Sequence, residues 1–415
     1  MSIKKVTIMK ILCADAIASD LFEPLRDQGH DVVIEPDLAA DTIPSRLTEL
    51  GANVLVVRST KVTDAAITAT PQLGLVVRAG AGTDNVDKVA ASAAGVYVCN
   101  VPGQNAIAVA ELAMGLLLAI DRHIAAGMAD FASGQWNKGL YSSADGIYGK
   151  RLAILGLGEI GFALAERANA FGMAVTALRK PGRSQRSLGR IRSAGITLVD
   201  DLDTLLGDAD VVSIHVPKSP DTVGMVDDDF LSKMPEGAIL LNTSRGEVVE
   251  EAALISAMDN RGIRAGLDVW PNEPSFKAGE WSSPLSTHPN VVGTHHIGAS
   301  TTQAQDAVAA GTVDVITAYT AGRITNCVNI DSESSGRAIL TVRHLDKVGV
   351  LAKIFDSLRS AGLNVSQMDN EVFSGAVAAV ASINIDAEPS GELLDALRTD
   401  ADILDVSVAE LGGKS

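Results

Sequence analysis

The chain has few cysteines: Cys13, Cys99 and Cys327 are the three among its 415 residues. Their odd number and wide spacing are typical of neither a disulfide framework nor a CxxC metal site. We therefore expect no bound metal and a reducing compartment, the cytoplasm. Basic residues are also scarce, 34 against 51 acidic residues, which gives a formal net charge of −17. Because such a charge repels phosphate groups, we expect neither nucleic acid nor an anionic membrane as a partner.

Long apolar runs are absent as well. The most apolar stretch, Ala106–Ile120, contains Glu111 and is shorter than the roughly 20 residues that span a bilayer. The first residues include lysines but no apolar signal region, so we expect neither export nor membrane insertion. A helix over Ala106–Ile120 is too apolar to lie free in water, and we expect it to form a hinge or to pair two nucleotide-binding domains.

What the chain does contain is a regular alternation of short apolar runs and helix-length segments. With 47% hydrophobic residues it can bury sizeable cores, and 415 residues suggest two or three domains. Ten runs are typical of buried strands: Lys10–Cys13, Asp31–Ile34, Val54–Arg58, Leu75–Arg78, Arg151–Leu155, Met173–Leu178, Val211–Val216, Ala238–Thr243, Ala265–Val269 and Val291–Thr294. Runs of this kind indicate parallel sheets covered on both faces, and their number predicts an α/β fold with two Rossmann-like, doubly wound domains.

The C-terminal part has a different pattern. Residues 331–336 form a small, polar, linker-like stretch. The following segments predict the order strand, helix, strand, strand, helix, strand: Ala338–Arg343, Val350–Ala361, Asn364–Glu371, Ala376–Ile385, Gly391–Arg398 and Ile403–Val408. This βαββαβ order is the ferredoxin-like pattern, and its length suits a small independent domain.

A glycine motif follows the predicted strand Arg151–Leu155. Gly156, Gly158 and Gly161 form a GxGxxG pattern that opens a helix, with a second strand after it. In this context the glycines allow a tight turn, a close approach to a pyrophosphate and close packing of helix on strand. Glu159 and Ile160 lie in the same helix start, whose free N–H groups attract phosphate. The motif predicts a dinucleotide site.

The acidic residue that an NAD site places at the end of its second strand is missing. Leu178 is followed by Arg179 and Lys180, and six basic residues but no acidic ones lie between 179 and 199. A guanidinium suits a 2′-phosphate, so we expect NADP(H) to be accepted and preferred. The alternative is a solvated basic loop, with NAD bound through other contacts.

Polar segments follow three later strands: 242–246 (Asn-Thr-Ser-Arg-Gly), 268–274 (Asp-Val-Trp-Pro-Asn-Glu-Pro) and 295–298 (His-His-Ile-Gly). Ligands in open α/β sheets lie beyond the carboxyl ends of strands. Together with the glycine motif, these segments resemble the D-2-hydroxyacid dehydrogenase family over about residues 10–328. The C-terminal unit resembles an ACT domain. The resemblance implies a substrate domain of residues 1–101 and 297–330, a dinucleotide domain of 102–296, a linker of 331–336 and an ACT domain of 337–415.

The resemblance also implies residue roles. His296 would be the acid/base, with Glu273 on its other ring nitrogen and Arg245 holding the substrate carboxylate. His295 competes with His296 for the role of base. The cofactor contacts that the resemblance implies, besides the glycine motif and the 179–180 pair, are His215, Val216, Pro217, Thr243 and Asp268. The substrate contacts that it implies are Arg58, Ser59, Arg78, Gly80, Ala81, Gly82 and Asn105, with the two arginines on a phosphate.

The function that this layout implies is oxidation of 3-phospho-D-glycerate, the first step of phosphorylated serine synthesis. One alternative is an NADP-linked hydroxypyruvate or glyoxylate reductase, and another is a non-catalytic sensor of NAD(H) or of an amino acid. In the ACT-like unit, His344, Asp346 and Asn364 would bind L-serine as an effector, unless the unit serves oligomerisation alone. We expect a homodimer or homotetramer.

Overall fold

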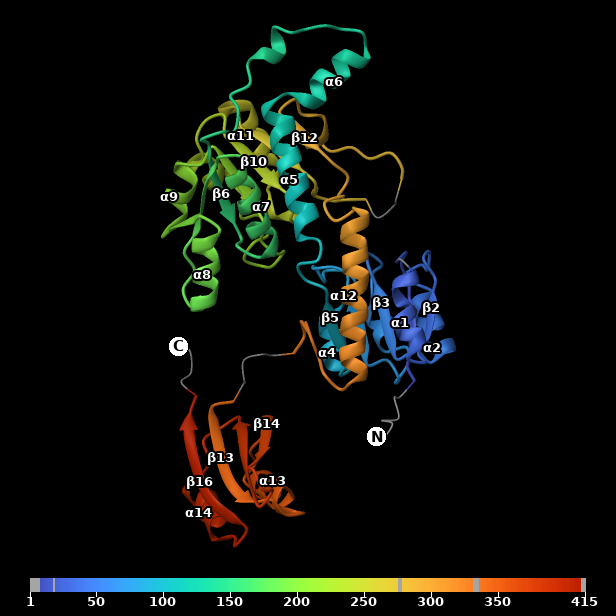
Figure 1. Cartoon of the computed structure of the whole chain (residues 1–415), viewed down its shortest axis with the longest axis vertical. Coiled ribbons are helices and arrows are strands. Elements are labelled where there is room, and N and C mark those ends of the chain that lie inside the picture. Colours follow the sequence, from blue (N-terminus) through green and yellow to red (C-terminus); the bar gives the residue numbers. More distant parts are fainter. Residues whose placement is uncertain (1–7, 18, 275–277, 331–335, 412–415) are drawn as a thin grey trace. The chain divides into compact units, whose positions relative to one another are not determined.

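The computed structural model describes residues 8–17, 19–274, 278–330 and 336–411 (Figure 1). The chain divides into two compact units, Met1–Asn329 and Ile330–Ser415, which we call the large unit and the C-terminal unit. Apart from Gly336, the predicted linker 331–336 lies outside the described residues.

The large unit contains two lobes, each built on a parallel sheet. The sheet of the first lobe has the strand order β2-β1-β3-β4-β5 within the described residues. Its strands are β1 (Lys10–Cys13), β2 (Asp31–Ile34), β3 (Val54–Val57), β4 (Leu75–Arg78) and β5 (Tyr97–Asn100), all paired in parallel. Strand β3 is buried along its whole length, as expected for a strand covered on both faces.

The second lobe carries the larger sheet, ordered β12-β11-β10-β9-β6-β7-β8. Its strands are β6 (Arg151–Leu155), β7 (Ala174–Leu178), β8 (Ile196–Val199), β9 (Val211–Ile214), β10 (Ile239–Asn242), β11 (Arg264–Leu267) and β12 (Val291–Gly293). All pairs are parallel, and the order reverses beside β6. The carboxyl ends of β6, β9, β10 and β11 therefore meet at one edge, where a doubly wound sheet binds ligands.

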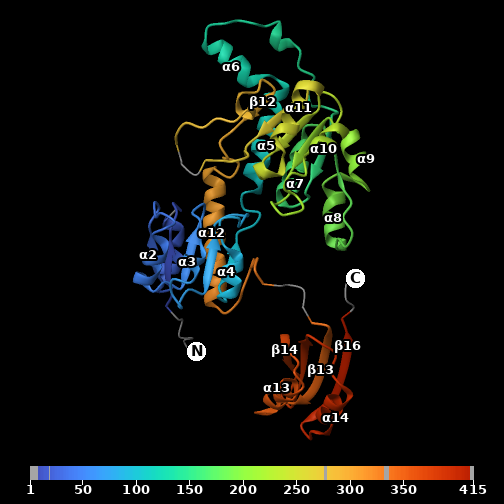
Figure 2. The same cartoon turned by 180° about the vertical axis from the view of Figure 1, so that it is seen from behind.

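Two helices connect the lobes. Helix α5 (Ala106–Asp121) leads into the second lobe, and α12 (Thr302–Thr320) returns to the first, where it lies along β4 (Figures 1 and 2). Val313, Val315 and Ile316 of α12 join the apolar core beneath the first sheet. The apolar residues of α5 pack against α7 (Glu159–Ala170) and the second sheet, so burial within its own lobe explains the composition of this helix.

The ten predicted strands are present, four with the predicted bounds and six with ends that differ by one or two residues. Two further strands, β5 and β8, were not predicted. Both are edge strands, and β8 buries fully only Ile196. Each has only four residues, and a run this short shows little periodicity and is easily overlooked.

The C-terminal unit is a four-stranded antiparallel sheet with two helices on one face. Its strands β13 (Ala338–Leu345), β14 (Val365–Val372), β15 (Ala378–Ile385) and β16 (Ile403–Glu410) are ordered β14-β15-β13-β16. Helices α13 (Val350–Ser360) and α14 (Gly391–Thr399) bury Ile354, Leu358 and Leu397 against alternate strand residues. The predicted βαββαβ order is confirmed. In the part of the chain that the structure describes, no helix is long and apolar enough to cross a membrane.

Candidate active site

The glycine turn after β6 makes a close backbone approach that a side chain would prevent. Gly156 has a φ of +99°, and a Cβ there would lie 2.5 Å from the carbonyl oxygen of His215 at the end of β9. A Cβ on Gly158 would meet nothing within 4 Å, so the space in front of α7 is open. The first N–H groups of α7 face this space, since its N-cap Gly158 has no side chain to cap them. The turn thus has the shape and polarity of a pyrophosphate site.

Two buried polar atoms beside this turn have no hydrogen-bond partner among the described residues: Nδ1 of His215 and Oγ1 of Thr243. Burial lowers the pKa of His215 to about 4, so its ring is neutral, and Nε2 lies 2.9 Å from the Ser213 hydroxyl. A buried polar atom without a partner is costly, and a bound ligand rich in hydroxyls and amides would satisfy both atoms. The residues present therefore fit a dinucleotide at this edge of the sheet.

Two of the basic residues after β7, Arg179 and Arg190, are paired with acids. Nε of Arg179 lies 2.6 Å from Oδ1 of Asp200, which follows the neighbouring strand β8. Arg190 holds Glu159 of the glycine motif through two hydrogen bonds of 2.6 and 2.8 Å, and this contact lowers the pKa of Glu159. Lys180 is exposed. A carboxylate from the adjacent strand thus lies beside Arg179 at the end of β7.

His296 and Glu273 form a hydrogen-bonded pair. Nδ1 of His296 lies 2.7 Å from Oε2 of Glu273. A carboxylate can only accept, so Nδ1 carries the proton and Nε2 is left for chemistry. The hydrogen bond to Glu273 raises the pKa of His296 more than burial lowers it. His296 adopts a left-handed backbone with φ of +53°, a strained conformation that the surrounding contacts must hold.

Asp268 and Trp270 supply those contacts. The buried carboxylate of Asp268 accepts hydrogen bonds from the Thr294 hydroxyl (2.6 Å) and from the N–H groups of Ile297 and Gly298 (2.8 Å each). Its backbone carbonyl accepts the N–H of His296 at 2.7 Å. The Asp268 side chain thus holds the turn that carries His296.

Trp270 connects the same turn to Glu273. Its backbone N–H donates to Oε1 of Glu273 at 2.9 Å, and its indole Nε1 donates to the carbonyl of Thr294 at 2.8 Å. The residue is 8% exposed, and Gly246 and Gly293 lie so close to it that neither could carry a Cβ without a shift. Trp270 therefore holds Glu273 through its backbone and, through its side chain, the segment two residues before His296.

Arg245 follows β10 and reaches the first lobe. Its Nε donates to Oδ2 of Asp84 at 2.8 Å, and its Nη1 donates to the Ser244 carbonyl at 2.7 Å. A Cβ on Gly82 would lie 2.0 Å from Nη2 of Arg245, so the guanidinium packs directly on the glycine loop after β4. The charge of Arg245 also acts on His296 and lowers its pKa slightly against the effect of Glu273. These contacts bring the predicted catalytic residues to one place between the lobes.

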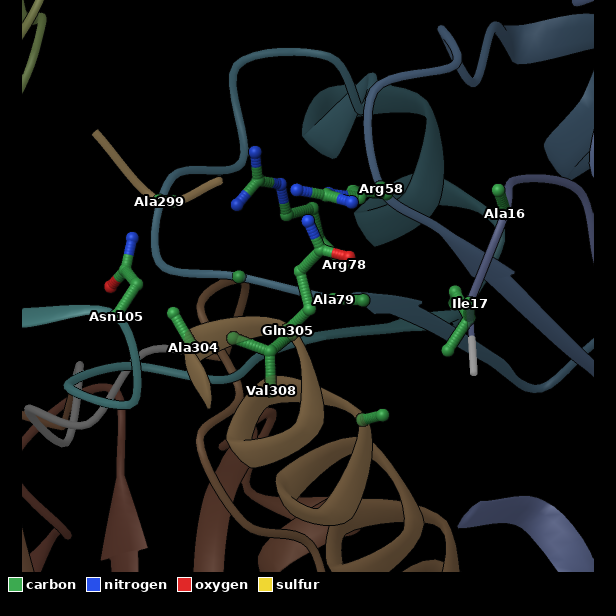
Figure 3. Close-up of a pocket in the computed structure, with 12 residues that line it drawn as sticks. Ala16, Ile17, Arg58, Arg78, Ala79, Asn105, Ala299, Ala304, Gln305 and Val308 are labelled. Carbon is green, nitrogen blue, oxygen red and sulfur yellow. The ribbon is translucent and has the colours of Figure 1, made fainter. Parts of the chain in front are cut away.

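A small cavity of about 70 Å³ lies on the first-lobe side of this place. Arg58, Arg78 and Asn105 line it together with Gln305 of α12, and Figure 3 shows the Arg58, Arg78 and Gln305 side chains directed toward one another. The cavity lining is completed by small and apolar positions: Ala16, Ile17, Ala79, Gly80, Ala299, Ala304, Val308 and Ala309. Burial, and after it the charges of Arg245 and Arg58, lowers the pKa of Arg78 to about 10, which leaves it protonated at neutral pH.

The polar atoms of this cavity are not satisfied by the protein. Nε of Arg78 and Oδ1 of Asn105 are buried and have no hydrogen-bond partner in the part of the chain that the structure describes. Three arginines near one cavity, with Asp84 as the carboxylate paired to Arg245, favour an anionic ligand.

Residues 59, 81 and 82 do not line this cavity. The amide and hydroxyl of Ser59 both bond to Asp15, at 3.1 and 3.3 Å, and the carbonyl of Ala81 accepts from Asn100 at 2.6 Å. Gly82 instead packs on Arg245. The contacts of Ser59 and Ala81 support the loops that carry the arginines, and a substrate contact at residues 59, 81 and 82 stays a prediction.

Comparison with known proteins agrees with this geometry. Residues 114–298 match the family model described as D-isomer specific 2-hydroxyacid dehydrogenase, NAD binding domain. The chain is 41% identical over 266 residues to a hydroxypyruvate reductase of Thermotoga maritima, a match that covers 64% of this chain and 83% of that protein. The chain belongs to the D-isomer-specific 2-hydroxyacid dehydrogenase family.

Further members of the family are similar over a larger part of the chain. A D-3-phosphoglycerate dehydrogenase of Methanocaldococcus jannaschii is 36% identical over 338 residues, or 80% of this chain. The match covers 62% of that relative, so the chain spans less than two thirds of its length. A crystal structure of an NAD+-bound 3-phosphoglycerate dehydrogenase from Entamoeba histolytica superposes with a TM-score of 0.64 at 26% identity, covering 78% of this chain and 99% of that one.

The predicted effector residues of the C-terminal unit do not meet within one chain. His344 is buried, with Nδ1 at 2.8 Å from the Leu345 carbonyl and Nε2 at 3.0 Å from Oδ1 of Asn370. Asp346 follows the end of β13, whereas Asn364 precedes β14, whose start lies level with the start of β13. At about 3.3 Å per residue, eight-residue strands separate the two by roughly 23 Å. Asp346 and Asn364 of one chain therefore lie at opposite ends of the sheet. An effector site that uses both residues at a domain–domain interface stays a prediction.

Several residues at the site of this family member escaped the sequence analysis. Asp15 binds the 58–60 turn through the N–H groups of Arg58, Ser59 and Thr60 at 2.7 to 3.1 Å. It lies two residues after β1, so the rule that polar residues follow strands would have found it. Asp84 lies in the loop after β4, close to the predicted substrate contacts 80–82, but no role was predicted for it. Gln305 sits on a helix far along the chain, and no local pattern indicates it.

Proposed function

We propose that this chain interconverts 3-phospho-D-glycerate and 3-phosphohydroxypyruvate with a nicotinamide cofactor. The observation that carries the proposal is the cavity lined by Arg58 and Arg78, on which the charge of Arg245 also acts. Among the described residues, Asp84 and Asp15 are the carboxylates that act on Arg78, so two carboxylates face three guanidinium groups. A substrate with a carboxylate at one end and a phosphate at the other supplies the missing charge. The M. jannaschii relative, named a D-3-phosphoglycerate dehydrogenase, supports this substrate.

The proton in this reaction is handled by His296. In oxidation, its unprotonated Nε2 accepts the proton of the C2 hydroxyl while Nδ1 keeps its proton on Glu273. In reduction, the imidazolium returns that proton to the keto oxygen. The raised pKa of His296 keeps enough of the protonated form near neutral pH for the second direction. When bound, the cofactor accepts a hydride from C2 or returns it.

Substrate orientation depends on Arg245 and the glycine loop. The guanidinium would bind the carboxylate and polarise the C2 oxygen, while backbone N–H groups around Gly80 receive the other carboxylate oxygen. Gly156, Gly158, His215 and Thr243 would hold the cofactor along the edge of the second sheet. These contacts place the reacting carbon between the two lobes, and closure of the lobes would exclude water.

The experiment compares reduction of 3-phosphohydroxypyruvate and of hydroxypyruvate by NADH and by NADPH. We expect turnover to favour the phosphorylated substrate strongly. Arg58→Gln should lower kcat/KM for that substrate by about 10- to 100-fold, the worth of one charged hydrogen bond, and should leave hydroxypyruvate reduction nearly unchanged. Arg46→Gln, on the surface helix α2 (Ile43–Leu50), is the matched control. Equal loss for both substrates would refute the assignment of Arg58 to the phosphate.

A second candidate is a hydroxypyruvate or glyoxylate reductase, which the 41% identity to the T. maritima enzyme favours. Preference for hydroxypyruvate in the same assay would establish it. A non-catalytic sensor is the third alternative, and His296→Ala separates it from both enzymes. An enzyme loses turnover in that variant, whereas a sensor retains its ligand response.

We propose that NADPH is accepted alongside NADH. Arg179 follows β7 on the side where the ribose of a bound dinucleotide would lie, and a guanidinium suits its 2′-phosphate. The ion pair with Asp200 competes for the same guanidinium, so we propose acceptance of NADPH without strong preference.

We also propose that the protein is a cytoplasmic homo-oligomer. Helix α6 (Ile124–Ala132) and the residues after it expose Ile124, Met128, Phe131 and Trp136, the last at 81%. In both views this segment stands out from the second lobe (Figures 1 and 2). Such a group of large apolar side chains is typical of a surface covered by a second copy. Phe131→Asp should shift the mass measured by light scattering to that of a smaller species, and an unchanged mass would refute this interface.

For the C-terminal unit we propose an ACT-type regulatory role with L-serine as the effector. A site that uses Asp346 and Asn364 together would need two copies, with the start of β14 of one beside the 343–349 turn of the other. Serine should therefore bind to the oligomer at each place where Asp346 of one copy lies beside Asn364 of another. If calorimetry detects no serine binding to the full chain, the effector role is refuted. The C-terminal unit would then serve oligomerisation alone.

A further inference from the structure

Cys99 and Cys327 face each other although the whole second lobe lies between them in the sequence. Cys99 lies on β5, the edge strand of the first sheet, and Cys327 lies in the segment that follows α12. The two residues form an isolated antiparallel bridge. The bonds that define it flank the pair: Asn100 N–H to the Asn326 carbonyl at 3.1 Å, and Val328 N–H to the Val98 carbonyl at 2.8 Å.

This hydrogen-bond pattern determines how far apart the two cysteines lie. Cys99 and Cys327 exchange no backbone hydrogen bonds with each other, so they are a non-hydrogen-bonded antiparallel pair. In such pairs the Cα atoms are about 4.5 Å apart and the side chains point to the same face. Disulfides span Cα separations of roughly 4.4 to 6.8 Å. The backbone already has a spacing that a disulfide can bridge.

The two thiols also interact. A hydrogen bond and the charge of Cys327 both act on Cys99, although burial is the larger reason that the pKa of Cys99 rises to about 12. Cys99 is 1% exposed, whereas Cys327 is only partly buried and donates its thiol to Oδ1 of Asn329 at 3.2 Å. Cys327 is therefore the thiol that an external reagent reaches first.

The segment around Cys327 is held firmly to the edge of the first sheet. The side chain of Asn329 accepts the N–H of Val98 at 2.8 Å and donates to the Val96 carbonyl at 2.9 Å. These contacts keep both cysteines in register, so forming a bond between them needs little rearrangement of the backbone. On the other side of Cys99, Asn100 supports the Ala81 carbonyl in the loop beside the substrate cavity.

We propose that Cys99 and Cys327 form a reversible intramolecular disulfide by exchange with a low-molecular-weight disulfide such as oxidised glutathione. The thiolate of Cys327, its proton lost to solvent, attacks one sulfur of the reagent, whose S–S bond breaks and releases one thiol after protonation. The deprotonated Cys99 then attacks the Cys327 sulfur and displaces the second thiol. The protein dithiol is oxidised by two electrons and the reagent is reduced by two.

The cross-link would stabilise the large unit. It closes a loop that contains the whole second lobe, and a link across a long loop reduces the freedom of the unfolded chain the most. Because Cys99 is buried, the second exchange step should be slow and should accelerate as the pH rises. We expect oxidation to raise the midpoint of thermal unfolding by about 5 °C or more.

The test incubates the full chain with oxidised glutathione at pH 8, blocks remaining thiols by alkylation after denaturation, and maps peptides without reduction. We expect one linked pair of peptides that contain Cys99 and Cys327, one alkylated cysteine, Cys13, and full reversal by dithiothreitol. Cys99→Ser should stop at a glutathione adduct on Cys327, and Cys327→Ser should remain largely unmodified. Cys13→Ser, which alters a buried thiol on β1, should leave the cross-link unchanged.

The outcomes that overturn the proposal are distinct. A stable glutathione adduct on Cys327 of the unaltered chain, without a linked pair, would show that Cys99 cannot complete the exchange. A link between two chains, seen as a doubled mass on a non-reducing gel, would equally refute an intramolecular bond, as would three alkylated cysteines after the incubation. The result does not depend on the substrate, so it can fail or succeed separately from the proposed enzymatic function.

Discussion

Nε of Arg245 lies 2.8 Å from Oδ2 of Asp84, and this ion pair joins the second lobe to the loop after β4 of the first. The contact orients a guanidinium that is 29% exposed and that the proposed mechanism places on the substrate carboxylate. Asp84 is thus a positioning residue for Arg245, supplied by the other lobe.

Asp84→Asn should weaken this orientation while preserving the shape of the side chain. Because the pair is partly exposed, solvent screens it, and we expect kcat/KM to fall by about tenfold and not more. The loss should appear mainly in KM for the 2-oxo acid, with KM for the cofactor unchanged. Asp41→Asn, an exposed position before α2, serves as the control. An unaltered KM would show that Arg245 does not need Asp84.

Glu273→Gln should change the pH dependence of the reaction. Glu273 raises the pKa of His296 through its hydrogen bond, and reduction requires the protonated ring. In the unaltered protein, reduction should persist until the pH rises through that raised pKa. In the variant the loss should occur at lower pH, and the oxidation rate should reach its plateau at lower pH as well. Steady-state rates in both directions between pH 5 and pH 9 test this shift, and superimposable profiles would refute it.

Trp270→Phe should remove the indole hydrogen bond to Thr294 while keeping an aromatic ring in the same place. One neutral hydrogen bond is worth about 1 kcal/mol, so we expect kcat to fall roughly fivefold. If Trp270 positions His296, the substitution should also shift the pH at which the reduction rate falls. A loss of stability alone would not shift that pH. Trp281→Phe is the matched control, since its ring packs at 5.4 Å from that of Trp270 but makes neither hydrogen bond.

Asp200→Asn should raise the preference for NADPH. The substitution frees the guanidinium of Arg179 from its counterion and removes a negative charge near the proposed position of the 2′-phosphate. Both residues are more than half exposed, so we expect only a several-fold rise in the ratio of kcat/KM for NADPH to that for NADH. Arg179→Gln should lower the same ratio. If neither variant moves it, Arg179 is a surface charge.

Asp15→Asn should lower stability in a pH-dependent way. Burial alone would raise the pKa of Asp15, but hydrogen bonds from Arg58, Thr60 and Ser59 outweigh it and lower the pKa below its usual value. A carboxylate with a lowered pKa stabilises the fold above its unfolded pKa of about 4, and this contribution is lost as the pH falls through the folded value. We expect a loss of about 1–3 kcal/mol at pH 7 that shrinks toward pH 3, measured by urea unfolding across that range.

Much of the fold follows from local patterns. The central strands were predictable because each is a continuous apolar run, and the glycine turn was predictable because its spacing admits few other uses. Strands β5 and β8 were not, since a run of four residues is too short for its period to stand out. The separation of Asp346 and Asn364 was not predictable either, because it depends on which sheet end each strand begins from.

The sequence by itself determined the residue types at the carboxyl ends of the strands, and with them the parallel sheets, the dinucleotide turn and the set of Arg245, Glu273 and His296. Only the tertiary structure decided which partners those residues have. Asp200 forms an ion pair with Arg179 from a neighbouring strand, and Asp84 forms one with Arg245 from the other lobe. Cys99 lies opposite Cys327, which belongs to the segment that returns to the first lobe. The physical reason is that hydrophobic periodicity is a local property, whereas charge pairing and thiol proximity depend on which strand ends the folded sheets bring together.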